Sequence, residues 1–93
     1  MKYKLLEAFQ TLIPIGAIVV TESTPISEGD YVKIGVETHG HSEKFWAVVY
    51  AIDRDNDKFA VRINQDLQLT HYHGLSDADE LVVERKHIVA IIK

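Results

Sequence analysis

The chain has 93 residues, with 10 Lys and Arg against 14 Asp and Glu, a formal net charge of −4, and no cysteine. This length predicts one domain, and the absence of cysteine excludes disulfides and thiolate chemistry. The acidic balance opposes binding to duplex nucleic acid, because neutralisation of phosphates drives such binding.

The N-terminal segment predicts a helix followed by a strand. Within residues 3–13, apolar residues recur at spacings of three and four: Tyr3, Leu6, Phe9 and Ile13. This spacing favours a short amphipathic helix, which Pro14 and Gly16 would end. Residues 17–22, AIVVTE, are rich in β-branched residues and predict a strand. The apolar run over residues 12–20 is too short to span a bilayer, which needs about 20 residues, so a cytoplasmic location is the default expectation.

Three segments in the middle of the chain predict further strands. Residues 31–37, YVKIGVE, alternate apolar and polar side chains, which indicates a strand with one face in solvent. Residues 44–53, KFWAVVYAID, are apolar on both parities, which predicts a central strand buried on both sides or covered by a partner subunit. The polar turn over residues 53–57 should connect it as a hairpin to residues 58–64, KFAVRIN. The residues expected to point inward in this last strand are Phe59, Val61 and Ile63.

The remaining segments are shorter. Residues 38–43 and 71–80 are interpreted as loops, and residues 67–70, LQLT, as a short edge strand. ELVVE and HIVAII would close the chain as two short strands, or as a strand, a turn and a strand. The whole pattern predicts a mainly β (α+β) fold, either a small, strongly bent antiparallel sheet or an SH3-like partly open barrel with one N-terminal helix. Residues 1–27 would supply the helix and first strand, and residues 28–93 the barrel-like core.

Four of the five histidines form two His-x-His pairs: His39 with His41, and His71 with His73. In an extended chain residues i and i+2 point the same way, so each pair can offer two imidazoles to one zinc ion. The adjacent glycines indicate loops, where this parity does not hold, and four histidines are not a usual structural zinc set. We therefore expect polar side chains on two loops and no cofactor, with a zinc site as the alternative.

Catalytic motifs are missing from the sequence. Ser42 and Ser76 stand outside any nucleophile-elbow motif, and the glycines form no phosphate-binding loop. The aromatic residues are more informative, because Trp46, Tyr31 and Tyr50 fall on the parity opposite to the expected core residues. Exposed aromatic side chains on a small barrel can stack bases or bind a peptide.

The order of segments over about residues 28–92 resembles the YegJ-like bacterial domain of unknown function. The stretches that carry the resemblance are EGDYVKIGVE, EKFWAVVYAID, KFAVRINQDLQLTHYHGLSDADEL and VVERKHIVAII. Within them the matching positions are Glu43, Phe45, Trp46, Asn64 to Asp66, Gly74, Leu75, Glu84, His87, Ile88 and Ile91. The resemblance implies a fold but no activity. It also implies that Glu43, Trp46, Asn64, Asp66 and His87 contribute to one surface.

These observations favour a non-catalytic protein-interaction or binding module with a partner protein or self-association as a homodimer, and no membrane. The residues expected to form its binding surface are Trp46, Tyr50, Tyr72, Asn64, Asp66 and His87. Two alternatives stay open. One is a small metal-binding protein or enzyme that uses the histidine loops, and the other is a domain that binds single-stranded nucleic acid on a barrel face.

Overall fold

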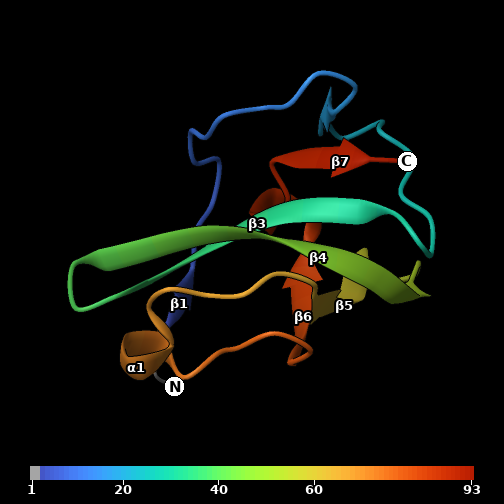
Figure 1. Cartoon of the computed structure of the whole chain (residues 1–93). Helices are drawn as coiled ribbons and strands as arrows, with labels where there is room; N and C mark the ends of the chain where they lie inside the picture. The colour runs from blue at the N-terminus through green and yellow to red at the C-terminus, as the bar shows by residue number, and fades with distance from the viewer. Residues whose placement is uncertain (1–2) are drawn as a thin grey trace.

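The computed structural model describes residues 3–93, and these residues form a mostly β fold with one seven-stranded antiparallel sheet (Figure 1). The hydrogen-bonded order is β2-β7-β3-β4-β5-β6, and β1 pairs with the part of β3 that β7 leaves free. The only helical elements in residues 3–93 are a single α-helical turn and a 3₁₀ turn. The elements are β1 (Lys4–Leu5), β2 (Ile18–Val19), β3 (Tyr31–Thr38), β4 (His41–Asp53), β5 (Lys58–Ile63), α1 (Thr70–His73), β6 (Glu80–Glu84), η1 (Arg85–His87) and β7 (Ala90–Ile92).

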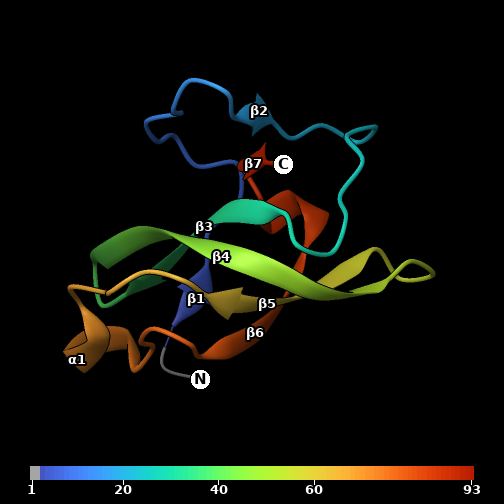
Figure 2. The ribbon, with the colours of Figure 1, turned by 45° about the vertical axis from the view of Figure 1, so that its right-hand side comes forward.

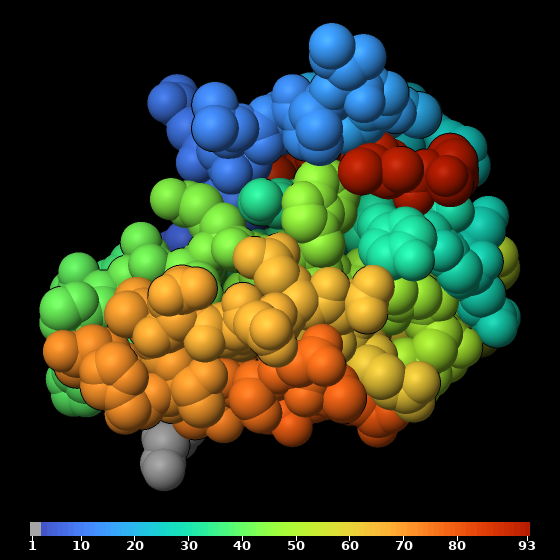
Figure 3. All heavy atoms as spheres, in the orientation of Figure 1, coloured from blue at the N-terminus to red at the C-terminus, as the bar shows by residue number. Residues whose placement is uncertain are grey.

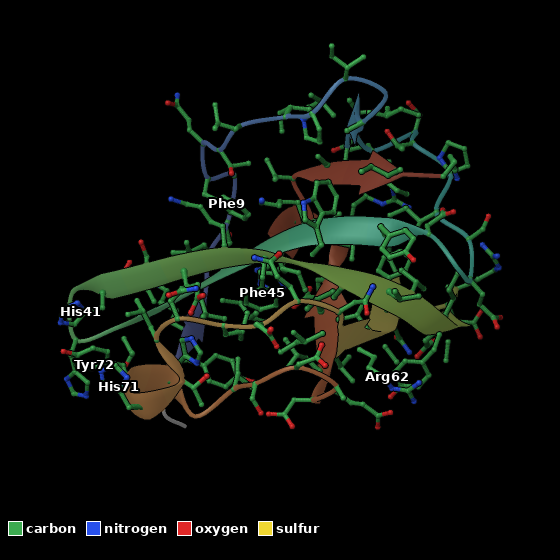
Figure 4. The ribbon with its side chains drawn as sticks, in the orientation of Figure 1. Phe9, His41, Phe45, Arg62, His71 and Tyr72 are labelled. Carbon is green, nitrogen blue, oxygen red and sulfur yellow. The ribbon has the colours of Figure 1, made fainter. Side chains whose placement is uncertain are left out.

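The core lies on the inner face of β3, β4 and β5, and the alternation predicted for β3 and β5 is confirmed. Within residues 32–36, 45–49 and 59–63, every second residue is no more than 2% exposed: Val32, Ile34, Val36, Phe45, Ala47, Val49, Phe59, Val61 and Ile63. Figure 4 labels Phe45, one of the largest buried side chains. Each buried side chain of this size stabilises the fold by about 1.5–3 kcal/mol relative to an exposed one.

Strand β4 is central in the sheet, between β3 and β5, as predicted, but the expectation that it is buried on both sides is wrong. Only one parity is fully buried, and Tyr50 on the other parity is 39% exposed. Trp46 and Val48 precede a β-bulge that shifts the register between Val49 and Ala51, and they are only half-buried. After the bulge, Ile52 pairs with the buried Phe59 and packs against the core. A bulge reverses which parity faces inward, and no sequence alternation signals this reversal.

The helix predicted over residues 3–13 is not formed. Lys4–Leu5 instead pair with β3 as strand β1, and the Leu6 N–H donates to the Gly35 carbonyl at 2.9 Å. In this extended segment Leu5 packs against the core while Leu6 covers Gly35 on the outer face. A short isolated helix is marginal in water, and tertiary packing of this kind overrides its propensity.

Two further predictions, the loop at residues 38–43 and the edge strand at residues 67–70, differ from the structure. The segment 38–43 is not a loop, because His39 and Gly40, both with positive φ, make a tight turn and His41 already belongs to β4. Two consecutive residues with positive φ are typical of the type I′ hairpin turn, whose twist matches that of the strands. The edge strand predicted at 67–70 is absent. The helical turn α1 begins at Thr70 and ends at His73, and Gly74, with a φ of 79°, caps it.

The closing segment follows the strand–turn–strand alternative. Strand β6 leads into η1, and β7 then pairs with both β2 and β3 (Figure 2). A reciprocal capping box stabilises η1, because the Glu84 side chain accepts from the His87 N–H and His87 Nδ1 accepts from the Glu84 N–H. Within residues 3–93, neither helical element has the length and apolar character that a membrane crossing requires.

Candidate binding face

The outer side chains of β3, β4 and β5 form two rows across the sheet. In one row Tyr31 lies opposite Val48, which lies opposite Arg62. In the other, Lys33 lies opposite Trp46. Tyr50 joins them, since the Arg62 guanidinium lies 5.1 Å from the centre of its ring. We call this set the aromatic face: Tyr31, Lys33, Trp46, Val48, Tyr50 and Arg62.

Cations and aromatic rings are in direct contact on the aromatic face. Lys33 Nζ lies 5.1 Å from the centre of the Trp46 ring, the same separation as in the Arg62–Tyr50 pair. Such contacts contribute about 0.5–1 kcal/mol at exposed sites. Partial burial, and then the charge of neighbouring Lys44, lowers the pKa of Lys33. The positive charge of Lys33 is therefore incompletely balanced by its surroundings, and an anion placed on this face would stabilise it.

The chain after β5 fixes the backbone at Trp46. The Asn64 N–H donates to the Trp46 carbonyl, and the Trp46 N–H donates to Gln65 Oε1, both at 3.0 Å. Beside this point the surface is hollowed by a cavity of about 250 Å³, to which Tyr50, Arg62 and Asn64 contribute. The aromatic face thus combines flat rings, positive charge and a recess large enough for a side chain.

Tyr72, predicted as part of the same surface, lies elsewhere. Its ring stacks on His41 at 4.1 Å between centroids and contacts His71 at 4.2 Å. Figure 4 shows these three side chains together at the tip of the β3–β4 hairpin, at the opposite side of the view from Arg62. They form a separate exposed cluster where α1 meets the hairpin, which the sequence did not indicate.

Glu43 and His73 form a buried pair that attaches α1 to the sheet. His73 Nε2 donates to Glu43 Oε1 at 2.9 Å, and His73 Nδ1 accepts the Leu75 N–H at 3.0 Å, so the imidazole is neutral with its proton on Nε2. Glu43 also accepts the backbone N–H groups of Gln68, at 2.6 Å, and Leu69, at 2.9 Å. Burial alone would raise the Glu43 pKa, but these donors lower it below its ordinary value. Both side chains therefore have structural partners.

His87 and Asp66 are not part of the aromatic face. His87 is buried in the capping box of η1, and burial is the largest cause that lowers its pKa. Asp66 is exposed in the segment between β5 and α1. Of the six residues predicted to form one surface, the structure brings together Trp46, Tyr50 and Asn64.

Three of the four histidines considered for zinc have other partners. His73 is turned to Glu43, while His41 and His71 lie against Tyr72. Across residues 3–93, no group of three or more His, Asp or Glu side chains is placed to hold a metal ion.

A second groove, with a volume of about 710 Å³, lies between the N-terminal segment, β2 and η1. Its basic residues are paired, Arg85 with Asp57 at 3.1 Å and Lys86 with Glu7 at 3.5 Å. Arg85 also donates to the carbonyls of Thr21 and Thr24, so it fastens the loop after β2. The charged groups on this groove are therefore engaged in holding the fold.

Sequence reasoning missed the basic residues of the aromatic face. The alternation of YVKIGVE and KFAVRIN places Lys33 and Arg62 outward, and this signal was available. The pairing register, which aligns Lys33 with Trp46 and Val48 with Arg62, was not available from any single segment.

No protein-family model matches the chain, and no curated protein or solved structure matches it.

Proposed function

We propose that this chain is a non-catalytic interaction domain that binds an extended acidic segment of a partner protein on the aromatic face. The observation that carries the proposal is that Lys33 and Arg62 contact the rings of Trp46 and Tyr50, with Lys44 close to Lys33, in a chain whose net charge is −4. In a protein with excess acid, a local cluster of cations creates a field that attracts anions to one place.

The aromatic rings and the basic side chains would contribute different interactions to binding. Tyr31 and Tyr50, which are 41% and 39% exposed, supply rigid apolar area that costs little side-chain entropy to bury. Lys33 gains stabilisation when a carboxylate arrives, because its charge is opposed by Lys44 and by partial burial. Arg62 is held by Glu80 at 2.6 Å on the exposed surface, where such pairs contribute little, so it can exchange that carboxylate for one from a ligand.

The test uses the single tryptophan of the chain as a reporter. A short synthetic peptide of alternating glutamate and leucine is titrated against the protein while Trp46 fluorescence is followed. We expect saturable binding that weakens as ionic strength rises from about 0.05 to 0.5 M, because the charges are near the surface. The matching peptide of alternating lysine and leucine should not bind.

Matched variants locate the site. Lys33→Gln should weaken binding of the acidic peptide about 5- to 30-fold, since loss of a charge pair costs about 1–2 kcal/mol at a partly desolvated contact. Lys86→Gln removes a lysine outside the aromatic face and should leave the affinity unchanged. Equal affinities for both variants and the wild type would reject this face as the site.

Single-stranded nucleic acid is the second candidate ligand, because the same contacts favour it. Rings that stack bases beside cations that hold phosphates are the usual way to bind single strands. A short oligothymidylate replaces the peptide in the same titration. Tighter binding of the oligonucleotide than of the acidic peptide, lost in Lys33→Gln, would assign the face to nucleic acid instead. The zinc alternative stays a prediction, which elemental analysis of untagged protein tests.

The detailed fold is part of the proposal. We infer that the sheet curls into a partly open barrel of the SH3-like type. Strand β6 lies at one end of the sheet and β7 lies near the other end. Only residues 85–89 connect these two strands, so the two ends of the sheet must lie close together. A sheet that bends strongly enough brings such ends together. The resemblance to the YegJ-like domain likewise stays a prediction.

A further inference from the structure

Strand β2 leaves one backbone edge unpaired. The Val20 N–H donates to the Val89 carbonyl at 3.1 Å, so it faces β7, and Ile18 pairs with Ile91 in the same register. Successive residues of a strand direct their N–H and C=O groups to opposite edges. The N–H and C=O of Val19 therefore point away from β7, and β2 ends the sheet order on that side.

The free edge of β2 lacks the charged side chains that usually protect an exposed edge strand from pairing with another chain. No Asp, Glu, Lys or Arg occurs from residue 8 to residue 21, although 26% of the chain is charged. Sheet edges are usually guarded by charged residues, because a free edge is a template for another strand. The other end of the sheet order follows this rule, since β6 carries Glu80 and Glu84 beside its exposed Val82.

Large exposed apolar side chains lie on β2 and in the segment just before it. Leu12 is 91% exposed, Ile15 is fully exposed, and Val19 on β2 is 58% exposed. Figure 3 shows the N-terminal part of the chain, in blue, standing above the sheet next to the C-terminal strand in red. We call these three residues and Ile18, which is 46% exposed, the apolar patch, and exposed apolar side chains gathered on one uncharged segment often mark an interaction site.

We propose that a second copy of this chain covers this patch through antiparallel pairing of β2 with β2. A two-fold axis beside Val19 lets each Val19 N–H donate to the Val19 carbonyl of the other copy, so both outward groups are satisfied. Because the patch is uncharged, two copies of net charge −4 can meet there without placing carboxylates against each other.

The dimer should be weak, because each copy contributes a two-residue strand and a few flanking apolar side chains. Specific, stable interfaces bury more than about 1,000 Å² in total, and a contact this small is expected near or below that limit. We therefore expect a dissociation constant that is micromolar or weaker. The interface also leaves the aromatic face open, because β7 lies between β2 and β3 in the sheet. The dimer would therefore present two copies of the proposed binding face, but it does not depend on that function.

The first experiment measures mass against concentration by sedimentation equilibrium, from about 1 μM to 1 mM. We expect a reversible monomer–dimer equilibrium for the wild type. Val19→Lys should raise the dissociation constant at least about 10-fold, because it puts two ammonium groups at the axis. Val82→Lys makes the same change at an exposed valine on the β6 edge and should shift the constant less than 2-fold.

A monomer throughout the concentration range overturns the proposal, as does a dimer that survives Val19→Lys or that Val82→Lys dissolves equally. If circular dichroism shows that Val19→Lys is unfolded, Ile15→Lys replaces it, since that side chain is fully exposed. Hydrogen exchange supplies a check on the wild type. The Val19 amide should exchange more slowly as concentration rises, and exchange that is independent of concentration contradicts the pairing.

Discussion

Glu43→Gln is the substitution whose effect follows most directly from the structure. Glu43 is nearly buried, and its two oxygens accept three hydrogen bonds from the segment that leads into α1. Oε1 receives the Leu69 N–H and His73 Nε2, and Oε2 receives the Gln68 N–H. A glutamine has nearly the same shape, but one of its two terminal atoms is a donor, so at least one N–H must then face an NH₂ group.

The size of the effect can be worked out bond by bond. A hydrogen bond to a charged group contributes about 1.5–3 kcal/mol, and a neutral one about 0.5–1.5 kcal/mol. Glu43→Gln loses one bond and converts two from charged to neutral, which gives a loss of about 3.5–6 kcal/mol in the free energy of unfolding. For a domain of this size the midpoint of thermal unfolding should fall by at least roughly 14 °C. Urea and thermal unfolding, followed by circular dichroism, measure both quantities.

The control is Glu37→Gln, which makes the same chemical change at an exposed position of the same hairpin. It should change stability by no more than about 0.5 kcal/mol. Because the folded-state pKa of Glu43 is lowered, its contribution is complete above about pH 4.5 and is lost as the pH falls further. The stability difference between wild type and Glu43→Gln should therefore shrink in acid. A loss below about 1 kcal/mol at neutral pH would refute this account of the α1 attachment.

Three further predictions concern other contacts. Gly35→Ala places a methyl carbon 2.8 Å from Leu6 Cδ1, the flexible end of a half-buried side chain that can move away, so stability should change by no more than about 1 kcal/mol. A double-mutant cycle with Leu6→Ala should show coupling of about 0.5 kcal/mol. Arg85→Lys loses the planar guanidinium that donates to two backbone carbonyls and a carboxylate, so it should lower the free energy of unfolding by about 1–3 kcal/mol. Lys86→Gln removes only an exposed ion pair and should cost under about 0.5 kcal/mol, with both variants measured by urea unfolding. Burial lowers the pKa of His87, so wild-type stability should fall as the pH drops below about 6.5, and a urea series of His87→Gln should lack that part of the slope.

The strands were predictable where alternation is clean. YVKIGVE and KFAVRIN each have one oily and one polar parity, and the structure buries the expected side chains. The helix predicted in the N-terminal segment was wrong, because apolar residues spaced three and four apart also occur in an extended chain. Such a chain can pack its side chains on both faces of a sheet, as Leu5 and Leu6 do. At β4 the misleading feature was the bulge, which lets both parities of one strand contact the core in turn.

The aromatic residues of the candidate site could be predicted from the sequence, but the contacts that its basic residues make with them could not. Trp46 and Tyr50 stand out by residue type, but Lys33 and Arg62 become their neighbours only through cross-strand pairing. Tyr72 stands out equally, and yet the Glu43–His73 pair holds α1, and Tyr72 with it, at the hairpin tip. Contacts between distant segments depend on register and on buried polar pairs, which local patterns do not encode.

The central claim is that the aromatic face is where this chain meets its ligand. Backbone amide NMR of the protein, recorded during titration with the alternating glutamate–leucine peptide, tests it residue by residue. The account predicts the largest shifts at residues 31, 33, 46, 48, 50 and 62, with the amides of α1 and η1 unmoved. Shifts confined to α1 or to the groove beside η1, or no shifts at saturating peptide, would contradict it.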